Sequence, residues 1–192
     1  MTIVGSDQLA EAFGRPPAVA PITLDHPRAA VAAIFRRSSD GTELLFIERA
    51  TRDGDPWSGQ MALPGGRVDR TDVSSSATAE RETREEIGVD LTHARRLGRL
   101  DDFHGGGRPI IVTPHGYWWD GAPPELRLNH EVAAALWVPL QHLGDPSNRI
   151  DYVYPPLGDQ RWPGIAVPGD RVVWGLTLRL LNDLFSRLPA HG

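Results

Sequence analysis

Three glutamates at helical spacing constrain this chain most. Glu82, Glu85 and Glu86 lie three and four residues apart within the charged stretch 79–89. On an α-helix these positions share one face, with neighbouring Cβ atoms roughly 5–6 Å apart. Like charges at this spacing destabilise a helix by roughly 0.2–0.5 kcal/mol per pair, and a counter-charge would relieve that repulsion. We expect a helix that ends at Gly88 and presents an acidic face.

Divalent cations are one counter-charge that such a face would bind. Mg²⁺ takes oxygen ligands and commonly sits between carboxylates and substrate phosphates. A solvated charged face, with Arg81 paired to Glu85, explains the same spacing without a metal. The glycines Gly65 and Gly66 upstream favour the metal interpretation, because glycine lets backbone approach a ligand closely, although they also fit an ordinary tight turn.

Composition excludes several other kinds of site and partner. The 192 residues include no cysteine, which rules out thiolate nucleophiles, disulfides and cysteine-based zinc sites. The formal charge of −5 does not favour nucleic-acid binding. No apolar stretch approaches the ~20 residues that span a bilayer, and the N-terminus lacks a signal-peptide pattern. We therefore expect a soluble, cytoplasmic protein with no nucleic-acid or membrane partner.

The rest of the chain alternates between strand-like and helix-like segments. After a lead-in over 1–28 with a short helix at 7–13, strands are expected at 29–35, 43–49, 96–103, 109–119, 132–138 and 150–154. A short helix is expected at 139–143. The C-terminal helix is expected over 171–188, on the helical spacing of Val173, Leu176, Leu180, Leu181, Leu184 and Leu188 before Pro189. This order predicts one α/β (α+β) domain, 1–192, with a mixed sheet between helices.

The charged stretch resembles the second half of a Nudix box. The family pattern reads Gly, five residues, Glu, seven residues, then Arg-Glu-aliphatic-x-Glu-Glu-x-Gly-aliphatic. Residues 81–89 read RETREEIGV, with Thr83 at the aliphatic position. Counted from Gly66, the first half matches with one extra residue and places Asp72 at the Glu position. The resemblance implies a Nudix fold, in which residues 66–89 form a loop-helix-loop.

The one-residue expansion resembles the coenzyme A pyrophosphatase branch of that family. So do the stretches GQMALPGG at 59–66, LDDF at 100–103 followed by VTP at 112–114, and VWGLT at 173–177. The branch also carries Leu-Leu-Thr-x-Arg-Ser, three residues, Arg, three residues, Gly. Here that stretch has an extra residue, Ala50 replaces the Ser, and Asp55 falls at the second Arg with Arg52 nearby. The departure bears on coenzyme A as substrate more than on pyrophosphate hydrolysis.

The resemblance implies roles for the residues of the box. Glu82, Glu85, Glu86 and the carbonyl of Gly66 would bind Mg²⁺ or Mn²⁺, with Glu85 and Glu86 counted among the catalytic residues. Arg81 would orient the glutamates by hydrogen bonds. For Asp72 we favour an N-terminal cap of the helix over a metal ligand.

Residues outside the box have two readings each. Glu131 resembles the family's downstream general base or extra metal ligand, and it also fits an exposed residue at a strand start. Arg52 and Arg67 would meet a terminal phosphate or lie solvated. Trp57 is the chosen base-stacking residue, whereas Trp118, Trp119 and Trp137 are expected in the core. His104, His115, His130 and His142 show no pairing four residues apart, so we expect structural or exposed histidines and no zinc site.

The implied reaction is attack by a metal-activated water on a diphosphate joined to a nucleoside. Coenzyme A or a derivative, cleaved to 3′,5′-ADP and a phosphopantetheine, is the first choice of substrate. A broader pyrophosphatase for nucleoside triphosphates, ADP-ribose or dinucleotides is the alternative. A non-catalytic nucleotide-binding module and a scaffold leave the converging carboxylates unexplained. Family members are often dimers, so the resemblance allows a homodimer, but no sequence feature identifies an interface.

Overall fold

A mixed β-sheet forms the centre of the molecule. The computed structural model describes residues 4–20, 26–52, 57–105 and 109–189, and within these ranges eight strands make up this sheet. They are β1 (Arg28–Ser38), β2 (Gly41–Arg49), β3 (Met61–Ala62), β4 (Gly65–Arg67), β5 (Arg95–Arg99), β6 (Phe103–His104), β7 (Ile111–Trp119) and β8 (Val132–Pro139). The strands expected from the sequence are confirmed with shifted ends, except that the strand expected at 96–103 is two short strands.

The pairing of β1 makes the sheet mixed. The main order is β3-β2-β1-β7-β5, with β4 on β1, β6 on β7 and β8 on β2. Strand β1 runs parallel to β7 and antiparallel to β2 and β4. This pairing holds β4, which carries the glycines of the box, at the centre of the sheet.

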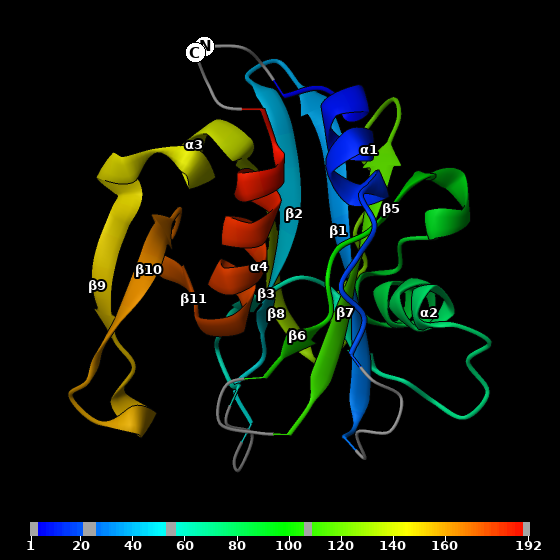
Figure 1. Cartoon of the computed structure of the whole chain (residues 1–192). Coiled ribbons are helices and arrows are strands. Elements are labelled where there is room, and N and C mark those ends of the chain that lie inside the picture. The colour runs from blue at the N-terminus through cyan, green and yellow to red at the C-terminus, as the bar shows by residue number, and fades with distance from the viewer. Residues whose placement is uncertain (1–3, 21–25, 53–56, 106–108, 190–192) are drawn as a thin grey trace.

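Helices cover both faces of this sheet, as predicted (Figure 1). They are α1 (Ser6–Gly14), α2 (Ser75–Ile87), α3 (Leu140–Gly144) and α4 (Gly175–Arg187). Successive side chains of a strand point to opposite faces. Phe35 and Phe46 accordingly pack with α1 and α4, whereas Ile34 and Leu45 pack on the side of α2.

The predicted core tryptophans differ in burial. Trp118 is buried in the cluster that α1 and α4 complete. Trp119 and Trp137 are partly buried and pack against the cluster on the side of α2. The guanidinium of Arg36 lies 4.6 Å from the ring centre of Trp137. The core prediction is therefore confirmed for Trp118, while the other two lie at the edge of the core.

A second, antiparallel sheet precedes the last helix and corrects the C-terminal prediction. Its order is β11-β10-β9, formed by β9 (Arg149–Val153), β10 (Arg161–Val167) and β11 (Arg171–Trp174). The helix predicted over 171–188 begins at Gly175, and Val173 pairs with Ile165 in this sheet. The reason is local: Val172, Val173 and Trp174 suit a pleated strand.

The remaining elements are short 3-10 helices, labelled η. They are η1 (Leu91–His93), η2 (Pro146–Asn148) and η3 (Pro155–Leu157). No helix in the described ranges has the length and apolarity needed to cross a membrane.

Candidate active site

Helix α2 begins and ends at identifiable capping residues. The Oγ of Ser74 accepts a hydrogen bond from the backbone N–H of Ala77. At the other end Gly88 adopts a left-handed conformation with φ 73°, and its N–H donates to the carbonyl of Arg84. The predicted end at Gly88 is confirmed. The predicted cap at Asp72 is wrong, because Ser74 lies directly before the first turn and occupies the capping position.

Asp72 holds Arg81 instead. Its carboxylate accepts hydrogen bonds from Nε and Nη2 of Arg81, at 3.0 and 2.9 Å, and from the hydroxyl of Thr78 at 2.8 Å. These bonds, those from Arg81 first, hold the pKa of Asp72 well below its usual range although burial opposes them. The expanded loop therefore supplies a charged partner that fixes one side of the Arg81 guanidinium.

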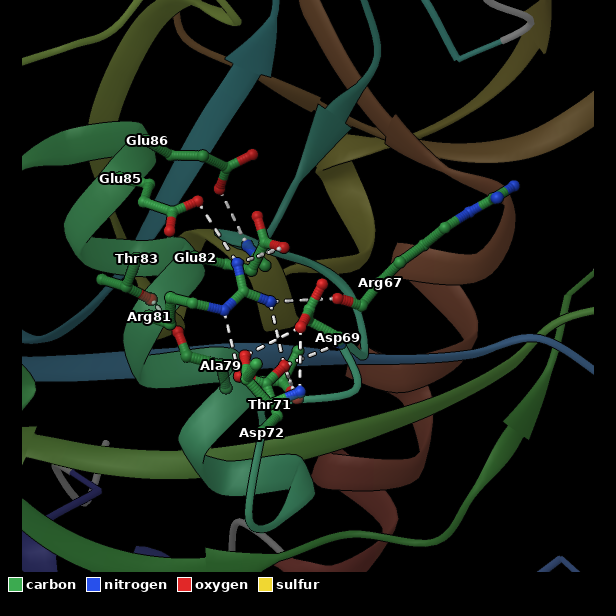
Figure 2. A network of polar contacts seen from close by, with 12 residues as sticks. Arg67, Asp69, Thr71, Asp72, Ala79, Arg81, Glu82, Thr83, Glu85 and Glu86 are labelled. Carbon is green, nitrogen blue, oxygen red and sulfur yellow. Dashed lines mark hydrogen bonds and ion pairs between the residues drawn. The ribbon is translucent and has the colours of Figure 1, made fainter.

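The other side of Arg81 reaches the glutamates (Figure 2). Its Nη1 donates to Glu82 Oε1 at 3.0 Å and to Glu85 Oε2 at 3.2 Å. Its Nη2 also donates to the carbonyl of Arg67 at 3.1 Å. Arg81 thus ties the acidic face of α2 to β4 and to the loop that follows it. The orienting role that the family resemblance implies for Arg81 stays a prediction, and it requires contacts of this kind.

Glu86 is the most buried carboxylate of the group. It is 2% exposed, and its Oε2 accepts a 2.8 Å hydrogen bond from the backbone N–H of Gly65. Burial raises the pKa of Glu86 to about 7, against the Gly65 hydrogen bond, and the charges of Glu82 and Glu131 raise it further. A cation beside this carboxylate would favour its ionised form.

The two glycines of β4 allow close approach on two sides, Gly66 to Glu82 and Gly65 to strand β1. A Cβ on Gly66 would lie 2.4 Å from Cδ of Glu82, closer than real Cβ atoms approach. A Cβ on Gly65, whose φ is 150°, would lie 2.3 Å from the carbonyl oxygen of Ala30 in β1. Close approach therefore requires glycine at both positions, and the backbone of Gly66 lies beside the partly buried carboxylate of Glu82. Burial raises the pKa of Glu82, whereas Arg81 lowers it.

The donor set suits a hard divalent cation. Three carboxylates and a backbone carbonyl are the oxygen ligands that Mg²⁺ and Mn²⁺ prefer. Among the described residues, no group of three or more His, Asp or Glu side chains already surrounds a common point. Glu85, whose side chain is 56% exposed, is engaged by Arg81. The chemistry of the residues fits the predicted cofactor, and the structure places Glu82 beside Gly66 and Glu86 on the N–H of Gly65.

Glu131 is brought to this group from a distant part of the chain. Its N–H donates to the side-chain oxygen of Asn129 at 2.7 Å, and the N–H of Asn129 donates to the carbonyl of Glu86 at 2.9 Å. Its charge raises the pKa of both Glu82 and Glu86. Sequence reasoning missed Asn129, although an Asn two residues before the candidate base is a signal for a side chain that binds nearby backbone.

The predicted substrate-binding residues occupy different environments. Arg52 donates from Nη1 to Glu131 Oε1 at 2.9 Å. Arg67 is exposed, and its side chain extends away from Arg81 (Figure 2). Trp57 is partly buried in the turn before β3. Asp55 lies outside the described residues. The structure thus brings Arg52 to the candidate base, whereas Arg67 lies outside the carboxylate group.

The histidines give no support to a zinc site. His115 is buried, and its Nε2 lies 2.9 Å from the hydroxyl of Ser75. Burial, then the charges of Arg96 and Arg99, lower the pKa of His115 to about 4. Nε2 of His142 lies 2.8 Å from the carbonyl of Ala166. Both make structural contacts, which confirms the expected structural role for these two histidines.

Comparison with known proteins shows which family the region around the carboxylates resembles. Residues 26–157 match the family described as NUDIX domain. An uncharacterized Nudix hydrolase, NudL, from Escherichia coli K12 is 32% identical over 178 residues, which cover 84% of this chain and 83% of the relative. Nudix hydrolase 22, chloroplastic, from Arabidopsis thaliana is 27% identical over 181 residues, 90% of this chain and 60% of that protein. The uncharacterized protein C14C4.10c from Schizosaccharomyces pombe is 43% identical over 107 residues, 52% of this chain and 32% of that protein.

Solved structures share the fold at low sequence identity. A MutT/nudix family protein from Enterococcus faecalis matches with a TM-score of 0.59 and 16% identity, over 97% of this chain and 75% of its own. The NUDIX domain of Shewanella oneidensis NrtR, complexed with ADP ribose, matches with a TM-score of 0.53 and 16% identity, over 84% of this chain and 88% of its own. At this level of identity the likeness concerns the fold alone.

Proposed function

This chain belongs to the Nudix family, and on that premise we propose that it hydrolyses a phosphoanhydride bond in a small nucleotide derivative. One observation carries the proposal. The buried carboxylate of Glu86 accepts a hydrogen bond from the Gly65 N–H of β4, and the partly buried carboxylate of Glu82 lies against Gly66, where a Cβ would not fit. A merely solvated acidic face has no need of such burial, which raises the pKa of both groups.

The residues would divide the work of hydrolysis between them. Glu82, Glu85, Glu86 and the Gly66 carbonyl would hold Mg²⁺ or Mn²⁺, and Arg81, fixed by Asp72, would keep the glutamates in place. Bound divalent ions supply positive charge to the phosphates and lower the pKa of a bound water. Glu131 would accept the proton of the attacking water as general base. Trp57 and Arg67 are proposed to contact the base and the phosphates of the substrate.

For the substrate we favour coenzyme A or a derivative. The supporting feature is the expanded box, which resembles that of the coenzyme A pyrophosphatase branch and whose Asp72 binds Arg81. The products would be 3′,5′-ADP and a phosphopantetheine. A homodimer remains a prediction.

A broader nucleotide pyrophosphatase is the second candidate, and a specific contact favours it. Arg52 lies near the position of the second arginine in the branch's upstream signature, yet its guanidinium is bound to Glu131. An arginine engaged in this way is not free to bind a substrate phosphate in the same position. Nucleoside triphosphates, ADP-ribose and dinucleotides are therefore the compounds to compare with coenzyme A.

Chromatographic product analysis tests both candidates. Coenzyme A, ADP-ribose, NADH and nucleoside triphosphates are incubated separately with the full chain and Mg²⁺ or Mn²⁺. We expect 3′,5′-ADP from coenzyme A at the highest kcat/KM. Faster cleavage of another diphosphate would replace coenzyme A as the substrate. Tight binding without turnover of any compound would instead identify a nucleotide-binding module.

A further inference from the structure

The C-terminal part of the chain holds the loop between β2 and β3 at three points. Before the loop, Nε of Arg171 binds Oε2 of Glu48 at 2.7 Å. After it, the hydroxyl of Thr177 donates to the carbonyl of Met61 at 3.2 Å. Within it, the phenol of Tyr154 donates to the carbonyl of Ser58 at 3.3 Å. Residues of β11, of α4 and of the turn directly after β9 therefore contact both ends of this loop and one residue inside it.

Ser58 passes this constraint to Arg52. Its Oγ accepts from the backbone N–H of Arg52 at 2.9 Å and donates to the carbonyl of the same residue at 2.9 Å. One hydroxyl thus binds both backbone polar groups of Arg52 and constrains the backbone from which its side chain extends. The guanidinium of Arg52 then binds Glu131 at 2.9 Å.

Glu131 is consequently held from two sides. Its backbone is tied to α2 through Asn129, and its carbonyl accepts from the N–H of Ala50 at 2.8 Å. Its side chain is 38% exposed, and the described structure gives its carboxylate a cationic partner in Arg52. Without that partner, a long exposed side chain would sample several rotamers.

Tyr154 is a rigid starting point for these contacts. Its ring is 9% exposed and lies 5.0 Å from the ring of Trp174, with an interplanar angle of 40°. Trp174 lies beyond residue 157, where the family match ends. A residue outside the matched region thus packs against Tyr154, the first residue in this chain of contacts.

We propose that Tyr154, Ser58 and Arg52 are positioning residues through which the second sheet orients Glu131 for catalysis. The inference rests on the proposed function, because it takes Glu131 as the general base. It also gives Arg52 a role other than phosphate binding. The Tyr154 phenol fixes the loop, the loop fixes Arg52, and Arg52 fixes the carboxylate.

Amide hydrogen exchange tests, without any substrate, whether the Tyr154 hydroxyl holds the loop that carries Arg52. Tyr154→Phe keeps the ring on Trp174 and removes the hydroxyl, so the amides of Ala50 and Arg52 should exchange roughly two- to tenfold faster. Tyr152→Phe is the matched control: its ring belongs to the same aromatic cluster, 5.5 Å from Trp174, and the described structure shows no hydrogen bond from its hydroxyl. Equal exchange in both variants would overturn the link between Tyr154 and the loop.

Steady-state kinetics on the best diphosphate substrate tests whether Arg52 positions Glu131 for catalysis. Arg52→Gln should lower kcat about tenfold or more with KM within about twofold, since misplacing a base slows the chemical step. Arg52→Lys should restore part of kcat, and Tyr154→Phe should lower kcat by roughly two- to tenfold. In a Glu131→Gln background, Arg52→Gln should have little further effect. A rise in KM alone for Arg52→Gln would overturn the proposal and make Arg52 a substrate-binding residue.

Together, the exchange and kinetic experiments distinguish failure of this inference from failure of the proposed function. If the wild-type chain cleaves no diphosphate, the proposed function fails, whatever the exchange data show. If Glu131→Gln lowers kcat while Arg52→Gln and Tyr154→Phe leave it unchanged, Glu131 is the base and its orientation by the second sheet is wrong. If Glu131→Gln itself keeps the wild-type rate, Glu131 is not the base and the positioning proposal falls with it.

Discussion

At the scale of single residues, Glu86 shows a conflict between stability and function. Its pKa is raised from the ordinary 4.5 to about 7, because the folded chain buries the carboxylate. The folded state therefore binds the proton more tightly than the unfolded state. The stability that this contributes is fully present below pH 4.5 and is lost as the pH rises through about 7. An ionised Glu86 thus weakens the fold at the pH where it would bind a cation.

Glu86→Gln should reverse that conflict. Glutamine keeps an oxygen acceptor for the Gly65 N–H and carries no charge. In buffer with EDTA at pH 8, the variant should be more stable by on the order of 1–3 kcal/mol, and the gain should shrink toward pH 4.5. With Mg²⁺ its kcat should fall by roughly 100-fold or more. Thermal unfolding across pH and steady-state hydrolysis measure the two effects.

Glu85→Gln is the control for that experiment, since the Glu85 side chain is 56% exposed. It should change stability by less than Glu86→Gln at pH 8, because an exposed charge pays little desolvation. A stability gain for Glu86→Gln that is the same at pH 5 and pH 8 would contradict the raised pKa. A wild-type kcat would contradict the metal-binding role of Glu86.

Residues of the site differ in how far the sequence predicts them. That Glu82, Glu85 and Glu86 lie together follows from their spacing alone, because helical geometry fixes which side chains share a face. The contact of Arg52 with Glu131 joins positions 79 residues apart, and no local pattern indicates it. The sequence therefore leaves Arg52 as a phosphate contact or a solvated residue, whereas the fold places its guanidinium on a carboxylate.

At the scale of elements, the start of α2 uses two residues for two purposes. Ser74 satisfies a free backbone N–H of the first turn. Asp72, whose side chain is 4% exposed, pairs with Arg81 and so acts on the glutamates. The two residues are two positions apart, which makes them a matched pair for separating helix stability from site geometry.

Ser74→Ala and Asp72→Ala should therefore have different effects. Loss of the cap should cost about 1 kcal/mol of stability and leave kcat within about threefold. Loss of Asp72 removes the charged partner that fixes Arg81, so kcat should fall roughly tenfold or more along with stability. Urea unfolding and kcat at saturating Mg²⁺ measure both. Equal losses of kcat in the two variants would show that Asp72 acts only through the stability of α2.

The elements were predicted where their pattern is regular. Strands β1, β2 and β7 are apolar runs, so they were expected close to their observed bounds, and the terminal glycine of α2 predicted where that helix ends. Strand β10 was missed because Pro163 and Gly164 lie inside it, and both residues are unfavourable within strands. Strand β11 was absorbed into the predicted helix because Val173 happens to continue the leucine spacing of α4.

At the scale of the whole molecule, the hydrophobic core includes residues outside the region that matches the family. The match ends at residue 157, but the cluster that packs on β1 and β2 includes Ile165, Val173, Leu181 and Leu184. Each of these four is at most 1% exposed. Helix α4 covers one face of the large sheet (Figure 1). The matched region therefore lacks the part of that cover which α4 supplies, and one domain over 1–192 stays a prediction.

A chain that ends at Leu157 should consequently fail to fold cooperatively. Fully burying one aliphatic side chain contributes about 1.5–3 kcal/mol, and a domain is stable by only about 5–15 kcal/mol. Removing β10, β11 and α4 takes away several such side chains and exposes Phe35 and Phe46 on the sheet. Circular dichroism, thermal unfolding and binding of a hydrophobic dye would report the loss. A chain that ends at Pro189 keeps every described residue and should unfold as the full chain does. Cooperative unfolding of the shorter chain would instead show that residues up to 157 fold alone, and the C-terminal sheet would then be an accessory layer.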